Sequence, residues 1–151
     1  MVISNSTISR NQAGGYGQMF CSYNPGGNVY TSGRLILRNT IVAYGMGTNC
    51  EGPITSDGYN LSDDSSCNFH NIGDRNNIDP KLGTLGNYGG PTQTIRLLSG
   101  SPAIDAGNPS GCTDGQGHLL KTDQRGMPRP NTEDIEDKKG CDMRAYERQS
   151  D

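Results

Sequence analysis

Residues 36–44, ILRNTIVAY, decide the fold because the chain contains further segments of the same pattern. The first is ISNSTISRN at residues 3–11, which superimposes with Ile8 on Ile41. In both segments, short runs with one or two apolar residues alternate with asparagine, serine or threonine. Short strands with polar corners are typical of coils that stack on one another.

A third copy continues the series. SDGYNLSDD at residues 56–64 places Leu61 on the position of Ile41. A coil of about 20–25 residues with one oversized loop explains the spacing of all three copies. That loop is GGYGQMFCSYNPGGNVYTSG at residues 14–33, which is rich in glycine and turn residues. The repeats therefore predict an all-β chain folded as a parallel β-helix, a solenoid.

The composition suits stacked coils better than a disordered chain. Leu, Ile, Val and Phe make up roughly a sixth of the residues, which alone would favour disorder. Disorder also requires a high net charge, whereas the formal net charge is only −3. A coil needs few inward apolar residues, because asparagine, serine and threonine can form ladders between coils.

Charge and hydropathy exclude two classes of partner. With 16 acidic and 13 basic side chains, the chain has no basic stripe to neutralise phosphates, so nucleic acid is not an expected partner. No run approaches the ~18 apolar residues of a spanning helix, so no membrane span is expected.

The cysteines indicate an oxidising compartment. They form no CxxC pair and accompany no histidine pair of zinc-finger spacing, which favours disulfides over structural zinc. The first residues, MVISN, contain neither a basic nor an apolar leader region. We therefore expect the C-terminal piece of a longer secreted or cell-surface protein, preceded by upstream β-helix coils.

The repeat phase is lost after Pro80. Residues 81–151 retain scattered apolar side chains without the earlier spacing, and NTEDIEDKKG at 131–140 is typical of a solvated loop. We expect one β-helix domain over residues 1–151. Its repeat coils occupy 1–80, and irregular closing coils form a C-terminal module over 81–151.

Three ordered motifs in the second half of the chain resemble a known family. They are LGTLGNYGGPTQTIRLLSGSPAIDAGNP at 82–109, TDQRGMPRP at 122–130 and CDMRAYE at 141–147. Together they resemble the C-terminal part of choice-of-anchor Q domain proteins, which are bacterial secreted or cell-surface proteins related in architecture to polymorphic outer-membrane proteins. The resemblance implies a right-handed parallel β-helix on an exported protein and no agreed catalytic residues. Met143 and Arg144 stand where the family pattern usually has Ile-Gly.

Asp105, in SPAIDAG, is a candidate for a structural or a chemical role. Its carboxylate can accept backbone N–H groups in an Asx-type turn. In a groove with Asp123 and Arg125, the same carboxylate is a candidate ligand or general acid–base. A buried carboxylate needs an arginine or several N–H donors beside it.

Arg125 can supply such a partner, because its planar guanidinium matches a carboxylate. In the structural interpretation it pairs with Asp105, Asp123 or Asp142 and locks the terminal coils. The alternative interpretation makes Arg125 the base of a polysaccharide lyase, by analogy with other lyases of β-helix fold.

No cofactor or metal is expected. Weak candidates for Ca²⁺ are Asp57, Asp63, Asp64 and Asp79, but their spacing resembles no calcium loop. His70 and His118 are far apart in the sequence and accompany no nucleophile motif, so both are interpreted as loop residues.

Five cysteines allow several two-disulfide arrangements. Sequence order and the module boundaries favour Cys50 with Cys67 and Cys112 with Cys141. Cys21 is then free in its loop or paired with a cysteine in upstream sequence.

Three tyrosines are the candidate ligand contacts. Tyr16, Tyr23 and Tyr30 lie in the 14–33 loop, where they can stack on sugar rings or pack the loop onto the coil face. Sequence and resemblance together predict an exported, adhesin-like or glycan-contacting β-helix module. The alternatives are a polysaccharide lyase or glycoside hydrolase acting in a groove on the helix face, and a stalk without a ligand.

Overall fold

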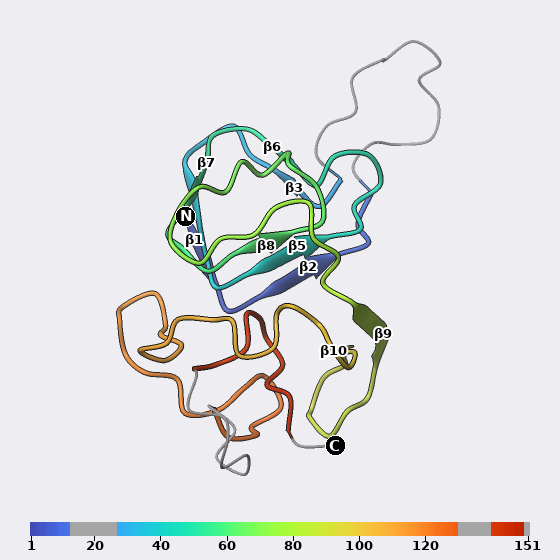
Figure 1. Ribbon diagram of the computed structural model, residues 1–151, viewed down its shortest axis with the longest axis vertical. Coiled ribbons are helices and arrows are strands. Elements are labelled where there is room, and N and C mark those ends of the chain that lie inside the picture. The colour runs from blue at the N-terminus through green and yellow to red at the C-terminus, as the bar shows by residue number, and fades with distance from the viewer. Residues whose placement is uncertain (13–26, 130–139, 150–151) are drawn as a thin grey trace.

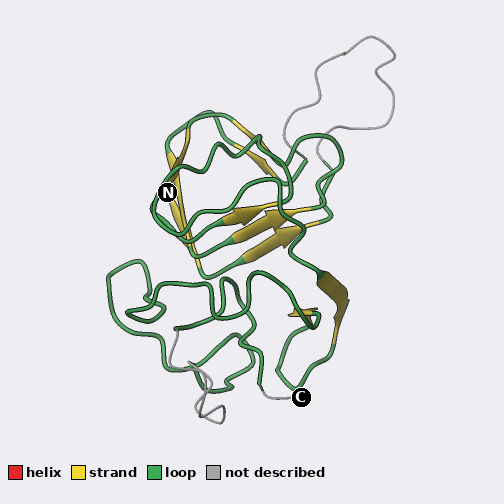
Figure 2. Cartoon of the chain, in the orientation of Figure 1, coloured by secondary structure: helices red, strands yellow, loops and turns green. Residues whose placement is uncertain are grey.

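The computed structural model describes residues 1–12, 27–129 and 140–149, and this part of the chain is all-β (Figures 1 and 2). Within those ranges there is no helix, and hence none that could cross a membrane. The strands are β1 (Val2–Ser4), β2 (Thr7–Ser9), β3 (Val29–Tyr30), β4 (Leu35–Arg38), β5 (Ile41–Ala43), β6 (Cys50–Glu51), β7 (Ile54–Ser56), β8 (Leu61–Ser62), β9 (Leu82–Gly86) and β10 (Thr94–Leu97).

Strands β1 to β8 form parallel sheets through which the chain passes in turn. The strand orders are β1–β4–β7, β2–β5–β8 and β3–β6, and every pairing in them is parallel. Because paired strands are separated in sequence by two others, each pass of the chain stacks on the preceding one (Figure 1). An isolated parallel bridge between Leu61 and Arg75 extends the stack. This arrangement is compatible with a β-helix-like fold.

The register confirms one predicted superposition and corrects the other. Ile41 pairs with Leu61, as the repeats predict. Ile8, however, pairs with Val42, so its superposition on Ile41 is wrong by one residue.

The polar corners set this register. Asn5 and Asn39 both have a φ of 49°, a left-handed conformation that asparagine tolerates better than most residues. Asn39 Nδ2 donates to Asn5 Oδ1 at 2.9 Å, so the equivalent turns stack. Ile3 consequently pairs with Leu37. Matching the isoleucines instead would have turned the strand's side chains to the opposite faces.

Strands β5 and β8 of the β2–β5–β8 sheet are buried on both faces, whereas β2 is half-buried. Val42 packs with Leu37 and Phe69 in a core enclosed by all three sheets. Its neighbours Ile41 and Ala43 belong to a second core, whose other buried members are Leu61, Leu82, Leu97, Ala103 and Met143. The C-terminal segment therefore lies against the outer face of this sheet, as the yellow to red chain beside β2, β5 and β8 shows (Figure 1).

The described residues beyond Pro80 contain no parallel pair. β10 pairs with β9 in antiparallel orientation, and the remaining bridges are isolated and antiparallel. Side-chain hydrogen bonds join this segment to the preceding chain. Ser101 Oγ donates to the Pro80 carbonyl at 2.6 Å, and Arg75 Nη1 donates to the Pro102 carbonyl at the same distance.

Both expected disulfides are present. Cys50–Cys67 lies in the core enclosed by the sheets, with 4.8 Å between the Cα atoms. Cys112–Cys141 joins two stretches of the C-terminal segment, with 5.8 Å between the Cα atoms. Cys21 lies outside the described residues. Two disulfides are consistent with an exported protein.

Candidate functional site

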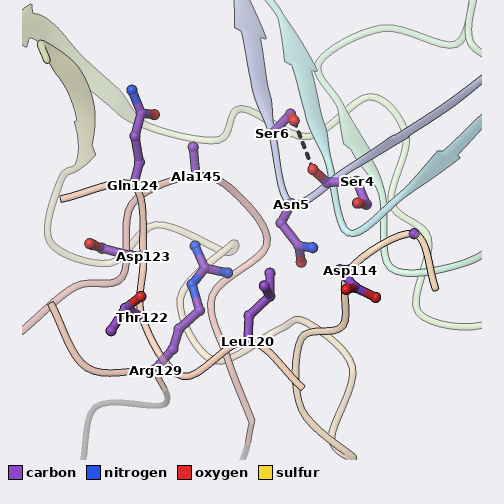
Figure 3. Close-up of a pocket in the computed structure, with 11 residues that line it drawn as sticks. Ser4, Asn5, Ser6, Asp114, Leu120, Thr122, Asp123, Gln124, Arg129 and Ala145 are labelled. Carbon is purple, nitrogen blue, oxygen red and sulfur yellow. Dashed lines mark hydrogen bonds between the residues drawn. The ribbon is translucent and has the colours of Figure 1, made fainter. Parts of the chain in front are cut away.

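A pocket of about 400 Å³ lies between the β1–β2 turn and the C-terminal segment (Figure 3). Its volume falls within the ~300–1,000 Å³ typical of small-molecule sites. Ser4, Asn5 and Ser6 form one wall. The other residues that line it are Asp114, Gly115, Leu120, Thr122, Asp123, Gln124, Arg129 and Ala145. The pocket thus joins residues from opposite ends of the chain.

Asn5 fixes the first wall to the second. Its side-chain Nδ2 donates to the Thr113 carbonyl at 2.7 Å, and its Oδ1 accepts from Asn39. Ser6 Oγ donates to the Ser4 carbonyl at 2.8 Å, which tightens the turn. The turn is therefore held in place before any ligand binds.

Asp123 organises the opposite wall. Its Oδ1 accepts the backbone N–H groups of Arg125 and Met127, and its Oδ2 accepts the N–H of Glu147 at 2.8 Å. Gln124, which follows it, donates from Nε2 to Thr92 Oγ1 at 2.8 Å. Asp123 is thus an Asx-type turn carboxylate whose oxygens are already occupied by donors.

Arg125 is paired with Asp123, one of the three carboxylates that the sequence left open. Its Nε and Nη2 donate to Asp123 Oδ2 at 2.9 and 2.7 Å. The remaining donors reach the carbonyls of Tyr88 and Glu147, and the guanidinium lies 3.5 Å from the centre of the Tyr146 ring. The side chain is 5% exposed. This guanidinium holds the C-terminal segment together and is not available to a substrate.

Asp105 does not line the pocket. It has a φ of 51°, and its backbone N–H donates to Asp142 Oδ1 at 2.9 Å. The structure therefore uses Asp105 in a left-handed turn that is bound to Asp142. Of the three candidates Asp105, Asp123 and Arg125, only Asp123 reaches the pocket.

Two further buried arginines and one glutamate complete the charged cluster, and the sequence interpretation missed them. Arg144 Nη2 donates to Asp142 Oδ2 at 3.0 Å. Arg129 Nε lies 3.6 Å from Glu147 Oε2, too far for a hydrogen bond. The departure of Met143-Arg144 from the Ile-Gly that the resemblance led us to expect was a usable signal for Arg144.

Burial dominates the protonation of this cluster. It raises the pKa of Glu147 to about 7, and the nearby Asp142 charge adds to the effect. It lowers the pKa of Arg144 to about 10 and also lowers that of Arg129. The ion pair of Glu147 with Arg129 is too long to offset the loss of hydration.

The raised pKa of Glu147 predicts that the stability of the fold depends on pH. Its pKa is higher in the folded chain than the ordinary 4.5. The contribution of Glu147 to the stability of the fold is therefore complete below pH 4.5 and is lost as the pH rises through about 7. The free energy of unfolding should be higher at about pH 5 than at about pH 8, by on the order of 2 kcal/mol. Denaturant titrations at the two pH values measure the difference.

Glu147→Gln is the control, because it keeps the side-chain shape without a titrating group. The variant should show a much smaller difference between the two pH values. An equal difference in the variant and the original protein would assign the effect to another group. Asp79 and Asp114 do not interfere, because hydrogen bonds from Tyr44 and His118 hold their pKa values below the ordinary 3.8.

The weak metal candidates are each engaged by protein donors. Asp57 pairs with Arg38, and Asp79 accepts the hydroxyl of Tyr44. Asp63 and Asp64 both accept from Asn49. Within the described ranges, no group of three or more acidic, histidine or cysteine side chains is arranged to hold a metal ion.

None of the described aromatic or histidine candidates lines this pocket, although His118 contacts the lining residue Asp114. Tyr30, on β3, is 61% exposed and does not line it, whereas Tyr16 and Tyr23 fall outside the described residues. His70 contacts Asn68 in a second hollow of about 270 Å³ beside β7. His118 is exposed and bonds to Asp114, at 3.0 Å from its Oδ2.

No protein-family model, curated protein or solved structure matches the chain. The function is therefore argued from the pocket's own residues.

Proposed function

We propose that the chain is a glycan-contacting module of an exported cell-surface protein, folded as a right-handed parallel β-helix and related to the choice-of-anchor Q domain proteins. The stacked parallel strands and the two disulfides support this proposal. The glycan site is the pocket between the β1–β2 turn and the C-terminal segment.

The observation that carries the proposal is the set of unused polar groups in the pocket. Among the described residues, the hydroxyls of Ser4 and Thr122 and the amide oxygen of Gln124 have no protein partner. Leu120 and Ala145 add apolar surface beside them. Hydroxyl and amide groups around an apolar patch match the hydroxyl and C–H surfaces of a sugar.

The chemistry of the pocket favours binding over glycan cleavage. A lyase base must be able to reach substrate, whereas Arg125 is occupied by Asp123, two carbonyls and the Tyr146 ring. Asp114 accepts the N–H groups of Gln116 and His118, so it closes its own turn. Adhesin-like contact is therefore the function that these residues support best.

A panel of uronic-acid and neutral polysaccharides tests the proposal. We expect saturable binding of at least one saccharide, without unsaturated or new reducing-end products. Thr122→Val should weaken binding about two- to tenfold by removing one hydrogen bond. Ser110→Ala, which removes an exposed hydroxyl outside the pocket, is the matched control. Turnover that is lost in Arg125→Ala, with the fold intact, would favour the lyase, and an absence of any binding would favour the stalk.

A further inference from the structure

Arg129 differs from the other buried arginines because no carboxylate is hydrogen-bonded to it. Arg125 donates to Asp123, and Arg144 donates to Asp142. Arg129 Nη1 instead donates to Cys112 Sγ at 3.1 Å, and its Nη2 donates to the Arg144 carbonyl. Its Nε has no hydrogen-bond partner among the described residues. With two neutral acceptors and one unused donor, this cation has the 3.6 Å ion pair with Glu147 but no hydrogen-bonded counter-charge among the described residues.

Arg129 also lines the pocket. Its side chain is only 2% exposed, and its guanidinium points toward the space between Asp123 and Leu120 (Figure 3). A charged group so buried is unfavourable unless it is paired. The Asp123 carboxylate already accepts hydrogen bonds from Arg125 and from the Glu147 backbone N–H. It therefore cannot reorient toward Arg129 without breaking these hydrogen bonds.

Among the described residues, Glu147 forms an ion pair with Arg129, with Asp142 acting on it as well, and Glu147 is a poor partner. Its Oε2 lies 3.6 Å from Arg129 Nε, and both carboxylate oxygens accept the N–H of Asp142. Among the described residues, Asp142, Arg129 and Arg144 are the charged groups that act on it. Because burial raises its pKa to about 7, Glu147 is increasingly neutral below neutral pH. The cluster then has three guanidinium groups against the carboxylates of Asp123 and Asp142.

We propose that the pocket binds a carboxylate-bearing sugar, a uronic acid residue, with the sugar carboxylate on Arg129 and its hydroxyls on Ser4, Thr122 and Gln124. This proposal rests on the glycan-binding function above and specifies its substrate class. The ligand carboxylate supplies the hydrogen-bonded anion that Arg129 lacks, and a guanidinium is the preferred partner for that group. Binding is strongest when Glu147 is protonated, because its charge then no longer competes for Arg129.

Calorimetric titrations with oligogalacturonate, a neutral galactose oligosaccharide of equal length, and acetate test this inference at about pH 6 and about pH 8. We expect oligogalacturonate to bind about tenfold more tightly than the neutral oligosaccharide, as one charge-assisted hydrogen bond allows. Its affinity should fall at the higher pH. Acetate should bind far more weakly than oligogalacturonate, because it makes no hydroxyl contacts.

Three variants separate the contributions. Arg129→Gln should abolish the preference for the uronate, whereas Arg96→Gln, at an exposed arginine outside the pocket, makes the same charge change and should preserve it. Glu147→Gln should bind oligogalacturonate tightly at both pH values. The higher affinity of Glu147→Gln for oligogalacturonate at about pH 8 can be measured whether or not Arg129→Gln folds. It therefore tests the uronate site even if Arg129→Gln unfolds.

The possible failures are distinguishable. Equal binding of the uronate and the neutral oligosaccharide would overturn the role of Arg129 and leave the glycan function standing. Acetate that binds as tightly as oligogalacturonate would overturn the sugar specificity. No binding of either oligosaccharide would overturn both proposals. An unchanged pH profile in Glu147→Gln would overturn the competition between Glu147 and the ligand.

Discussion

Arg144→Met is expected to lower the free energy of unfolding by about 3–5 kcal/mol, because it leaves a buried carboxylate without its cation. Arg144 is fully buried, and its Nη2 donates to Asp142 Oδ2 at 3.0 Å. Its Nη1 reaches the Ile95 carbonyl of β10, so this one side chain also links the chain end to the β9–β10 hairpin. Equilibrium denaturation of both proteins measures the loss.

Two controls identify the cause. Arg96→Met removes an exposed arginine from β10, the strand whose Ile95 carbonyl Arg144 contacts, and should change the stability by less than about 0.5 kcal/mol. Combining Arg144→Met with Asp142→Asn should recover part of the loss, because the amide carries no charge to leave unpaired. A loss below about 1 kcal/mol in Arg144→Met would show that Asp142 finds compensation elsewhere.

Replacing both Cys112 and Cys141 with alanine is expected to lower the free energy of unfolding by about 4 kcal/mol. The disulfide spans 29 residues, and loop-closure entropy assigns a larger effect to longer loops. Asn39 Nδ2 donates to Cys112 Sγ at 2.8 Å, so the disulfide also sits against the corner that aligns the stacked strands. Denaturation of the double variant measures the effect.

The shorter disulfide provides the matched control. Cys50–Cys67 spans 17 residues, and its removal should cost about 3 kcal/mol by the same relation. The predicted order is therefore a larger loss for Cys112–Cys141. The reverse order would show that core packing around Cys50 and Cys67 outweighs loop length. Five free thiols in the unsubstituted protein, denatured without a reductant, would contradict both disulfides.

The sequence predicted the stacking of parallel strands because each copy contains its own apolar and polar positions. Leu61 aligned correctly with Ile41 for this reason. The alignment of Ile8 failed because matching isoleucines ignored the left-handed turns at Asn5 and Asn39. Those turns are fixed by contacts between passes of the chain, which no single copy reveals.

The position of the C-terminal segment had a local signal that was not used. Ile41, Val42 and Ala43 are consecutive apolar residues, and a strand that is apolar without alternation is typical of burial on both faces. A continuous run therefore indicated that something covers the outer side of β5. Which segment covers it depends on packing between distant parts of the chain.

The candidate site was only partly accessible from the sequence. Asp123 and Arg125 are two residues apart in one turn, so their pairing was among the predicted alternatives. The pairing of Arg129 with Glu147 depends on the folded path of the segment between them. The pocket itself unites Ser4 with Thr122, and no local pattern connects residues so far apart in the chain.

Backbone amide chemical shifts, recorded while a binding saccharide is titrated into the protein, test the location of the site most directly. The pocket predicts shifts concentrated at residues 4–6, at residues 120–124 and at Ala145, with Tyr30 unchanged. Shifts centred on Tyr30, or on the second hollow around His70, would contradict this location and place the glycan contact on another face.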